Sequence, residues 1–197
     1  ESTYQQLQKE NTTTASSEDT VSDNSDWIDE LAATYPCVDV TPIDSENYIG
    51  WIYVPNTNIS YPVMQGNDNK YYLKHDYAGK RSAAGSIFLD YRSNGVTDPH
   101  AIIYGHNMMY GSMFSRLKDY INVKNYAEEH PVFWIIQPDG KKIFYGVFAA
   151  DCPRKDNKYI YTIIRTVGTD ESDKSRSFFS DMLNFMQRRT VYDYGLD

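Results

Sequence analysis

The sequence predicts a mainly β fold, a barrel or sandwich, with helices at its periphery. Three observations indicate this class. Short apolar or alternating runs recur through the middle of the chain, and turn-forming residues separate them. Tyrosine, which has good strand propensity, accounts for 18 of the 197 residues. The helical patterns are few, and the strongest is amphipathic, as expected of a helix that packs on a sheet.

The first part of the chain has a different composition from the rest. Residues 1–25 are dominated by Glu, Ser, Thr, Gln, Asp and Asn, with too few apolar side chains to form a core. We therefore expect a flexible N-terminal tether over 1–25 and one folded domain over 26–197. The domain should begin with a short helix over 27–31, where apolar residues have acidic neighbours. Pro36 and Pro42 then mark a connector.

Six strands are expected after this connector. They cover residues 48–54, 59–64, 85–89, 101–104, 132–137 and 142–150. The sequence Pro138-Asp139-Gly140 lies between the last two runs and predicts a hairpin turn. Many short strands at this spacing are typical of a barrel or sandwich.

Two helical stretches are expected among or after the strands. The first runs from Met113 towards Glu129 and ends before Pro131. The second is a long amphipathic helix near the C-terminus, with arginines in its last turn that complement the helix dipole. Its apolar residues follow a 3.6-residue period at Phe178, Phe179, Met182, Leu183, Phe185 and Met186. We expect this helix to pack on the sheet.

Composition and motifs exclude several function classes. The chain has 19 Lys and Arg against 27 Asp and Glu, so it lacks the basic footprint of a nucleic-acid-binding protein. No apolar run approaches the roughly 18 residues needed to span a bilayer. There is no close-spaced metal-ligand motif, no G-x-S-x-G elbow and no glycine-rich phosphate loop. We therefore expect no metal, no cofactor and no nucleic-acid partner.

A candidate catalytic residue follows the fourth expected strand. Residues 101–108 form an apolar run that stops at Gly105 and then presents His106. Because the pKa of histidine lies near neutrality, a histidine held at a strand end by a glycine turn is a candidate acid or base. The alternative is a partly buried, hydrogen-bonded structural histidine, because catalysis also requires a partner group in suitable geometry.

The two cysteines, Cys37 and Cys152, are candidate nucleophiles because a thiol and a histidine are the minimal set for thiol catalysis. They could also pair, but sequence spacing says nothing about disulfide geometry. Cys152 follows Asp151, whose charge would raise the thiol pKa and weaken the nucleophile. Cys37, beside Pro36 in the connector, is a still weaker candidate.

Several blocks resemble the class B sortases, the cysteine transpeptidases that attach surface proteins to the Gram-positive cell wall. The resemblance covers roughly residues 27–197 in collinear order. Its blocks are Tyr48-Ile49-Gly50-Trp51-Ile52, Tyr61-Pro62-Val63-Met64-Gln65, Asn69-Lys70-Tyr71-Tyr72-Leu73, Ala84-Gly85-Ser86-Ile87-Phe88-Leu89-Asp90, Tyr104-Gly105-His106-Asn107, Met113-Phe114 and Tyr159-Ile160. It implies a sortase-like β-barrel that has an N-terminal helix and a long helix near the C-terminus.

The resemblance also implies a chemistry. A cysteine thiolate would attack the threonine carbonyl of a C-terminal sorting motif, His106 would protonate the leaving amine, and an arginine would stabilise the oxyanion. A peptidoglycan or lipid-linked precursor amine would then resolve the thioester. The peptide groove would be formed by Asn69, Leu73, Tyr104, Tyr159 and Ile160. Such a protein would act as a monomer at the extracellular face of the membrane, held by an N-terminal anchor.

One departure from the family pattern leaves a second interpretation open. The family's nucleophile lies in a Thr-Leu-x-Thr-Cys strand after the last helix, and an arginine lies on the next strand; neither occurs before Asp197. We therefore expect the last strands to be missing and the 197-residue chain to be inactive alone. The alternative is a non-catalytic cell-surface β module, adhesin-like or pilin-like, that binds through its tyrosines. In that case His106 would be replaceable, and each groove residue would serve packing or turn formation.

Overall fold

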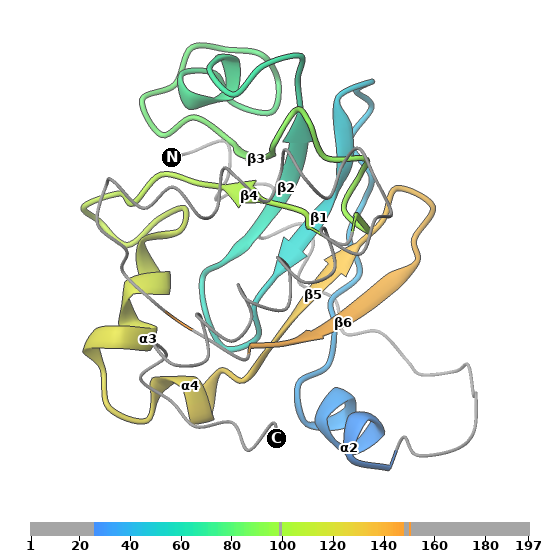
Figure 1. Ribbon diagram of the computed structural model, residues 1–197, viewed down its shortest axis with the longest axis vertical. Coiled ribbons are helices and arrows are strands. Elements are labelled where there is room, and N and C mark those ends of the chain that lie inside the picture. The colour runs from blue at the N-terminus through green and yellow to red at the C-terminus, as the bar shows by residue number, and fades with distance from the viewer. Residues whose placement is uncertain (1–25, 99, 148–149, 151–197) are drawn as a thin grey trace, which may run out of the picture.

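The computed structural model describes residues 26–98, 100–147 and 150, and these residues form a six-stranded curled sheet with short helices around it (Figure 1). The strands are β1 (Tyr48–Tyr53), β2 (Ser60–Gln65), β3 (Ile87–Leu89), β4 (Ile103–Tyr104), β5 (Val132–Ile136) and β6 (Lys142–Gly146). The mainly β fold is confirmed, and all six expected strands are present, although β3 begins two residues later than predicted and β6 ends at Gly146. The shortest is β4, which begins two residues later than predicted.

The order of strands across the sheet is β4-β3-β2-β1-β5-β6. The β5–β6 pair is the predicted hairpin, closed by a hydrogen bond of 2.9 Å from the Gly140 N–H to the Gln137 carbonyl. In contrast, β2 and β3 are parallel, so the chain must cross over between them. The crossover spans residues 66–86 and contains the 3-10 helix η1 (Tyr71–Leu73), which lies beyond the arrowhead of β2 (Figure 1).

Both faces of the central strands β1, β2 and β3 are buried, because neighbouring residues of a strand enter different apolar clusters. Ile52 and Val63 belong to one cluster, whereas Trp51 and Met64, their neighbours in the chain, belong to the other. This alternation follows from the two-residue period of a strand. It also explains why the strands read as continuous apolar runs, since a sheet covered on both faces needs no polar face.

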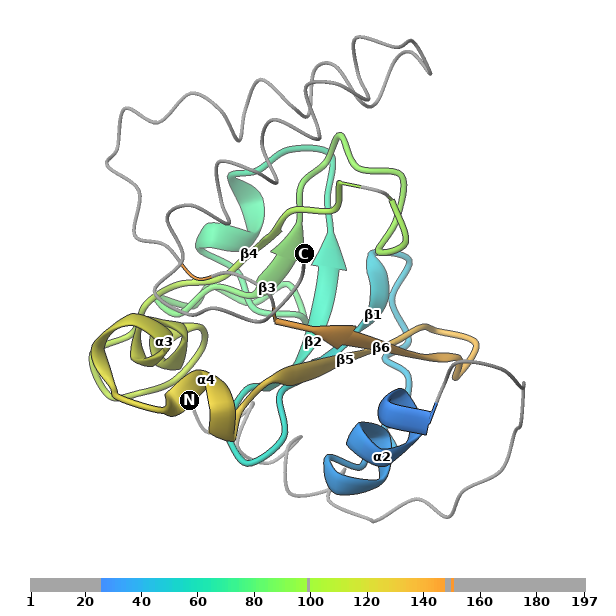
Figure 2. The same cartoon turned by 60° about the horizontal axis from the view of Figure 1, so that its bottom comes forward.

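The predicted N-terminal helix is present as α2 (Asp26–Thr34). The residue that follows it is fixed to the sheet, because the Trp134 indole N–H donates to the Tyr35 carbonyl at 2.9 Å. The chain after the helix is tied to β6 by an ion pair of 2.8 Å between Lys142 and Asp39. Figure 2 shows α2 below the β5–β6 hairpin.

The helical stretch expected between Met113 and Glu129 is broken into three short pieces. They are η2 (Ser115–Lys118), α3 (Asp119–Asn122) and α4 (Tyr126–Glu129). Val123 is extended and Asn125 has a φ of 62°, in the left-handed region that asparagine tolerates better than most residues. The prediction of one continuous helix was therefore wrong.

Other expectations fall outside the described residues: the tether over 1–25, the long amphipathic helix with its apolar face at 178–186, and part of the sixth strand. Among the residues that the structure does describe, no helix has both the length and the apolar character needed to cross a membrane.

Candidate active site and peptide groove

His106 lies two residues after the end of β4, as predicted, but Gly105 between them acts differently from the expectation. Gly105 does not adopt a left-handed backbone. Instead, a Cβ atom at this position would lie 2.4 Å from Ile87 Cδ1 and 2.6 Å from Phe114 Cδ2. Such distances are far inside van der Waals contact. Only glycine therefore lets the chain pass between these two side chains. This close packing fixes the position of the His106 backbone.

The backbone of His106 is also held from its C-terminal side. Residues 107–113 form a loop that returns antiparallel to itself, and the Phe114 N–H donates to the His106 carbonyl at 3.0 Å. The Met113 N–H donates to the Tyr61 hydroxyl at 3.0 Å, which ties the loop to β2. The imidazole is thus presented by a backbone that is fixed on both sides.

A cavity of about 570 Å³ adjoins the imidazole. Its lining residues are Leu73, Lys74, Arg81, Ser82, Ala83 and His106. The structure therefore brings His106 and Leu73 together, as the resemblance implied. Lys74 and Arg81 were not predicted from the sequence, and their positive charges favour a carbonyl or anionic oxygen in this cavity.

Two of the four histidines have a ring that is engaged by a hydrogen bond, whereas His106 and His100, whose Nδ1 is buried without a partner in the described residues, do not. His75 stacks on Tyr71 and shares a hydrogen bond of 2.8 Å with the Tyr71 carbonyl. His130 is buried and bonds the Pro55 carbonyl at 3.1 Å. The imidazole of His106 makes no hydrogen bond to any residue within 26–98 and 100–147, so within this part of the chain it is available for proton transfer.

Asn69 and Tyr104, which the resemblance implied as peptide-binding residues, meet at one buried carboxylate. The Asn69 Nδ2 donates to Asp90 Oδ2 at 2.7 Å, and the Tyr104 hydroxyl donates to the same oxygen at 2.9 Å. Arg92 completes the group: its Nε donates to Oδ1 and its terminal nitrogen to Oδ2, each at 2.8 Å. The side chain of Asp90 is 0% exposed, and no sequence signal pointed to it as part of the site.

Asp90 remains ionised in spite of this burial. Burial by itself would raise its pKa. The hydrogen bonds from the Arg92 side chain and backbone, and from Asn69 and Tyr104, outweigh that effect and hold the pKa of Asp90 well below its usual range. The group is therefore a fixed negative charge that accepts hydrogen bonds at neutral pH.

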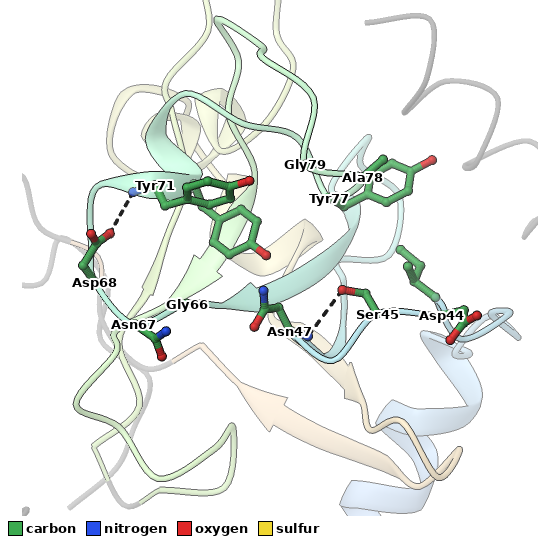
Figure 3. Close-up of a pocket in the computed structure, with 12 residues that line it drawn as sticks. Asp44, Ser45, Asn47, Gly66, Asn67, Asp68, Tyr71, Tyr77, Ala78 and Gly79 are labelled. Carbon is green, nitrogen blue, oxygen red and sulfur yellow. Dashed lines mark hydrogen bonds between the residues drawn. The ribbon is translucent and has the colours of Figure 1, made fainter.

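The helix η1, which carries Leu73, is fixed by hydrogen bonds at its start and by close packing at its end. Asp68 Oδ1 accepts from the backbone N–H groups of Lys70 and Tyr71 at 2.8 and 2.9 Å, and Figure 3 shows the second of these bonds. On the other side of η1, Gly85 has a φ of 58°, and a Cβ there would lie 2.4 Å from the Tyr72 carbonyl oxygen. These contacts hold η1 so that Leu73, 36% exposed, faces outward.

A second cavity, of about 770 Å³, lies near the start of β1 and the end of β2 (Figure 3). Its lining includes Asn47, Asp68, Tyr71 and Tyr77. The predicted site residues His106, Asn69, Leu73 and Tyr104 do not line it. The segment around η1 contributes to both cavities: Tyr71 and Tyr72 line this one, whereas Leu73 and Lys74 line the cavity of His106.

Cys37 does not have the properties of a catalytic nucleophile. It is buried, its thiol donates to the Val38 carbonyl at 3.4 Å, and burial raises its pKa to about 11. The thiolate, which is the reactive form, is therefore scarce at neutral pH. The remaining predicted residues, Tyr159, Ile160 and Cys152, lie outside the described residues.

Comparison with known proteins defines the class to which this fold and site correspond. The model of the family described as "Sortase domain" matches residues 52–182, which is more than half of the chain. The matched range includes His106, Asn69, Leu73, Tyr104 and Asp90. The chain therefore belongs to the sortase domain family.

Within that family the similarity is to class B. The Sortase B of Listeria monocytogenes is 46% identical over 90 residues, 45% of this chain and 36% of that protein. The Sortase B of Staphylococcus aureus is 34% identical over 119 residues, 60% of this chain and 48% of that protein. The chain thus spans less than half the length of these two curated relatives.

Solved structures give the same result over a longer range. The structure of sortase B from Listeria monocytogenes superposes with a TM-score of 0.65 at 33% identity, covering 77% of this chain and 81% of that one. A Staphylococcus aureus sortase B-substrate complex superposes with a TM-score of 0.66 at 28% identity, covering 78% of this chain and 66% of that one. These values confirm the sortase-like fold expected from the sequence.

Proposed function

We propose that the full-length protein is a class B sortase transpeptidase that cleaves a C-terminal sorting motif after its threonine. A cysteine thiolate attacks the threonine carbonyl carbon, the peptide C–N bond breaks, and a thioester forms. An amine of peptidoglycan, or of its lipid-linked precursor, then attacks the thioester and releases the thiolate. In the class B pattern the nucleophile lies on the strand that follows the last helix.

His106 is the proposed general acid. In the first step it gives a proton to the leaving amine, and in the second step it takes a proton from the incoming amine. The observation that carries this assignment is the position of His106: its imidazole lines a cavity together with Leu73 and is not engaged by a hydrogen bond within the described residues. The membership in the sortase family supports the same role.

The proposed peptide groove extends from this cavity. Leu73 supplies an apolar wall, and Asn69 and Tyr104 hydrogen-bond the extended peptide backbone. Tyr159 and Ile160 complete the groove in our proposal. A related protein, the Staphylococcus aureus sortase B, has been solved as a substrate complex, which supports a peptide ligand for this fold. We further propose that the protein acts as a monomer at the outer face of the membrane, held by an N-terminal anchor.

The experiment uses the full-length protein and a quenched fluorescent peptide that carries a sorting motif. His106→Ala is expected to lower kcat by at least about 100-fold, the lower range for loss of an acid-base group, with little change in thermal unfolding. The control is His130→Gln. His130 does not line the cavity of His106, and a glutamine amide can keep a hydrogen bond to the Pro55 carbonyl, so kcat should stay within about threefold.

Three results would contradict the proposal. A His106→Ala protein that keeps more than a tenth of its turnover would remove the catalytic role of this residue. A full-length wild type that neither cleaves sorting-motif peptides nor forms a thioester would favour the non-catalytic surface module. Thioester formation by the 197-residue chain alone, which we expect to be inactive, would show that the nucleophile lies within it.

A further inference from the structure

We propose that Asp90 is a positioning residue that sets the affinity for the sorting-motif peptide, because it holds the Asn69 amide and the Tyr104 hydroxyl in the orientation that binds the peptide backbone. Asp90 itself does not touch the peptide in this proposal. The inference rests on the proposed function and adds to it a residue that neither motif spacing nor strand position identified.

Asp90 joins three separate parts of the fold. It follows β3, while Asn69 lies in the crossover after β2 and Tyr104 ends β4. The position of Asp90 is fixed by its own backbone: its N–H donates to the Ile102 carbonyl at 2.8 Å, and its carbonyl accepts from Gln65 Nε2 at 2.9 Å. The carboxylate is therefore a rigid reference point for both groove residues.

The carboxylate also decides which atoms the groove presents. An ionised carboxylate can only accept hydrogen bonds. Asn69 must then direct its Nδ2 at Asp90, and its Oδ1 accepts from the Tyr91 N–H at 3.1 Å, so the amide cannot flip. Tyr104 gives its hydroxyl proton to Asp90. Towards a peptide this hydroxyl acts as an acceptor, which suits a backbone N–H.

The groups around Asp90 also favour an ionised carboxylate that accepts hydrogen bonds from Asn69 and Tyr104. The titratable groups that interact with its carboxylate are Arg92 beside it, Tyr104 on β4 and His100 in the segment before β4. Arg92 binds both carboxylate oxygens, while its own side chain is 29% exposed. Asp90→Asn would leave one acceptor oxygen in place of two and would set an amide N–H against the donors of Arg92 and Tyr104.

The test is a kinetic double-mutant cycle in the full-length protein with the sorting-motif peptide. Asp90→Asn is expected to raise KM at least about tenfold, equivalent to about 1.4 kcal/mol, while kcat changes less than threefold. In a Tyr104→Phe, Asn69→Ala background the same change should raise KM less than twofold, because the groups through which Asp90 acts are gone. The control is Asp119→Asn, another buried carboxylate, which pairs with Arg116 outside the groove. Its KM should stay within about twofold.

Each outcome shows whether Asp90 positions the groove residues or only stabilises the fold. An unchanged KM for Asp90→Asn, or an equal rise in KM in both backgrounds, would show that Asp90 serves the fold alone. If Asp90→Asn does not fold, Arg92→Gln takes its place in the cycle: a KM rise that disappears without Tyr104 and Asn69 supports positioning, and an undiminished rise overturns it. Failure of the wild type to turn over any sorting-motif peptide would instead refute the proposed function.

Discussion

Replacing Gly105 by alanine tests whether close packing determines the position of His106. The added methyl group would lie 2.4 Å from Ile87 Cδ1 and 2.6 and 2.7 Å from Phe114 ring atoms, whereas carbon atoms in contact lie at about 3.5–4.0 Å. At least one neighbour must therefore move by about 1 Å. Overpacking of this kind typically costs about 1–3 kcal/mol.

The assay compares thermal unfolding and peptide cleavage of the full-length Gly105→Ala and Gly146→Ala proteins. For a domain of this size, each kcal/mol shifts Tm by about 2–4 °C, so Gly105→Ala should lower Tm by about 2–12 °C. Turnover should fall further, because the displaced segment carries His106. Gly146 is the matched control: among the described residues other than its two chain neighbours, no heavy atom lies within 4 Å of its added Cβ, and the Tm of this variant should change by less than about 2 °C. Equal Tm values for the two variants would refute the packing argument.

Three further predictions concern separate features. Leu73→Ala should raise the peptide KM about three- to tenfold with little change in Tm, because this side chain is partly exposed and lines the cavity that we propose as part of the peptide groove; titration of the same peptide checks it. The Cys37 thiol should react with an aromatic disulfide reagent far more slowly below pH 9 in the native protein than in denaturant, because its native pKa is about 11. The pKa of Asp90 is depressed, so its stabilisation is complete above about pH 4, the usual pKa of a free Asp, and is lost as pH falls towards the native value. The difference in Tm between wild type and Asp90→Asn should therefore be constant from pH 5 to 8 and shrink below pH 4; a difference that is flat at all pH values would contradict this assignment.

The β elements could be predicted from the sequence because their signals are local. Pro138-Asp139-Gly140 contains the residues that a tight turn requires, and the flanking runs have the composition of strands. The structure places the hairpin between β5 and β6 at this turn. The parallel pairing of β2 with β3 had no such signal, because it depends on contacts between segments that are separated by the crossover over 66–86.

The helical stretch shows how tertiary contacts override a local pattern. The composition from 113 to 129 favours a helix, yet the chain breaks at Val123 and Asn125. The Tyr120 hydroxyl donates to the His130 carbonyl at 2.6 Å, a contact that joins the pieces on either side of the break. Helix propensity differs by less than about 1 kcal/mol per residue, so one such contact is enough to decide the local path.

The candidate site was only partly predictable for the same reason. His106 could be identified because a strand, a glycine and a histidine are adjacent in the sequence. Asp90 could not, because its partners Asn69 and Tyr104 are 21 and 14 residues away. Hydrogen-bond partners at such separations become visible only once β2, β3 and β4 are placed side by side.

The crossover between β2 and β3 has a consequence for how the proposed peptide preference can change in evolution. A tight turn cannot connect two parallel strands, so the chain needs a long crossover between β2 and β3. Asn69 and Leu73 lie in this crossover. Doubling the length of a flexible loop adds only about 0.6 kcal/mol of closure entropy. New recognition surfaces can therefore be inserted into the crossover at small cost to folding, while His106, on the far side of β3, keeps its place.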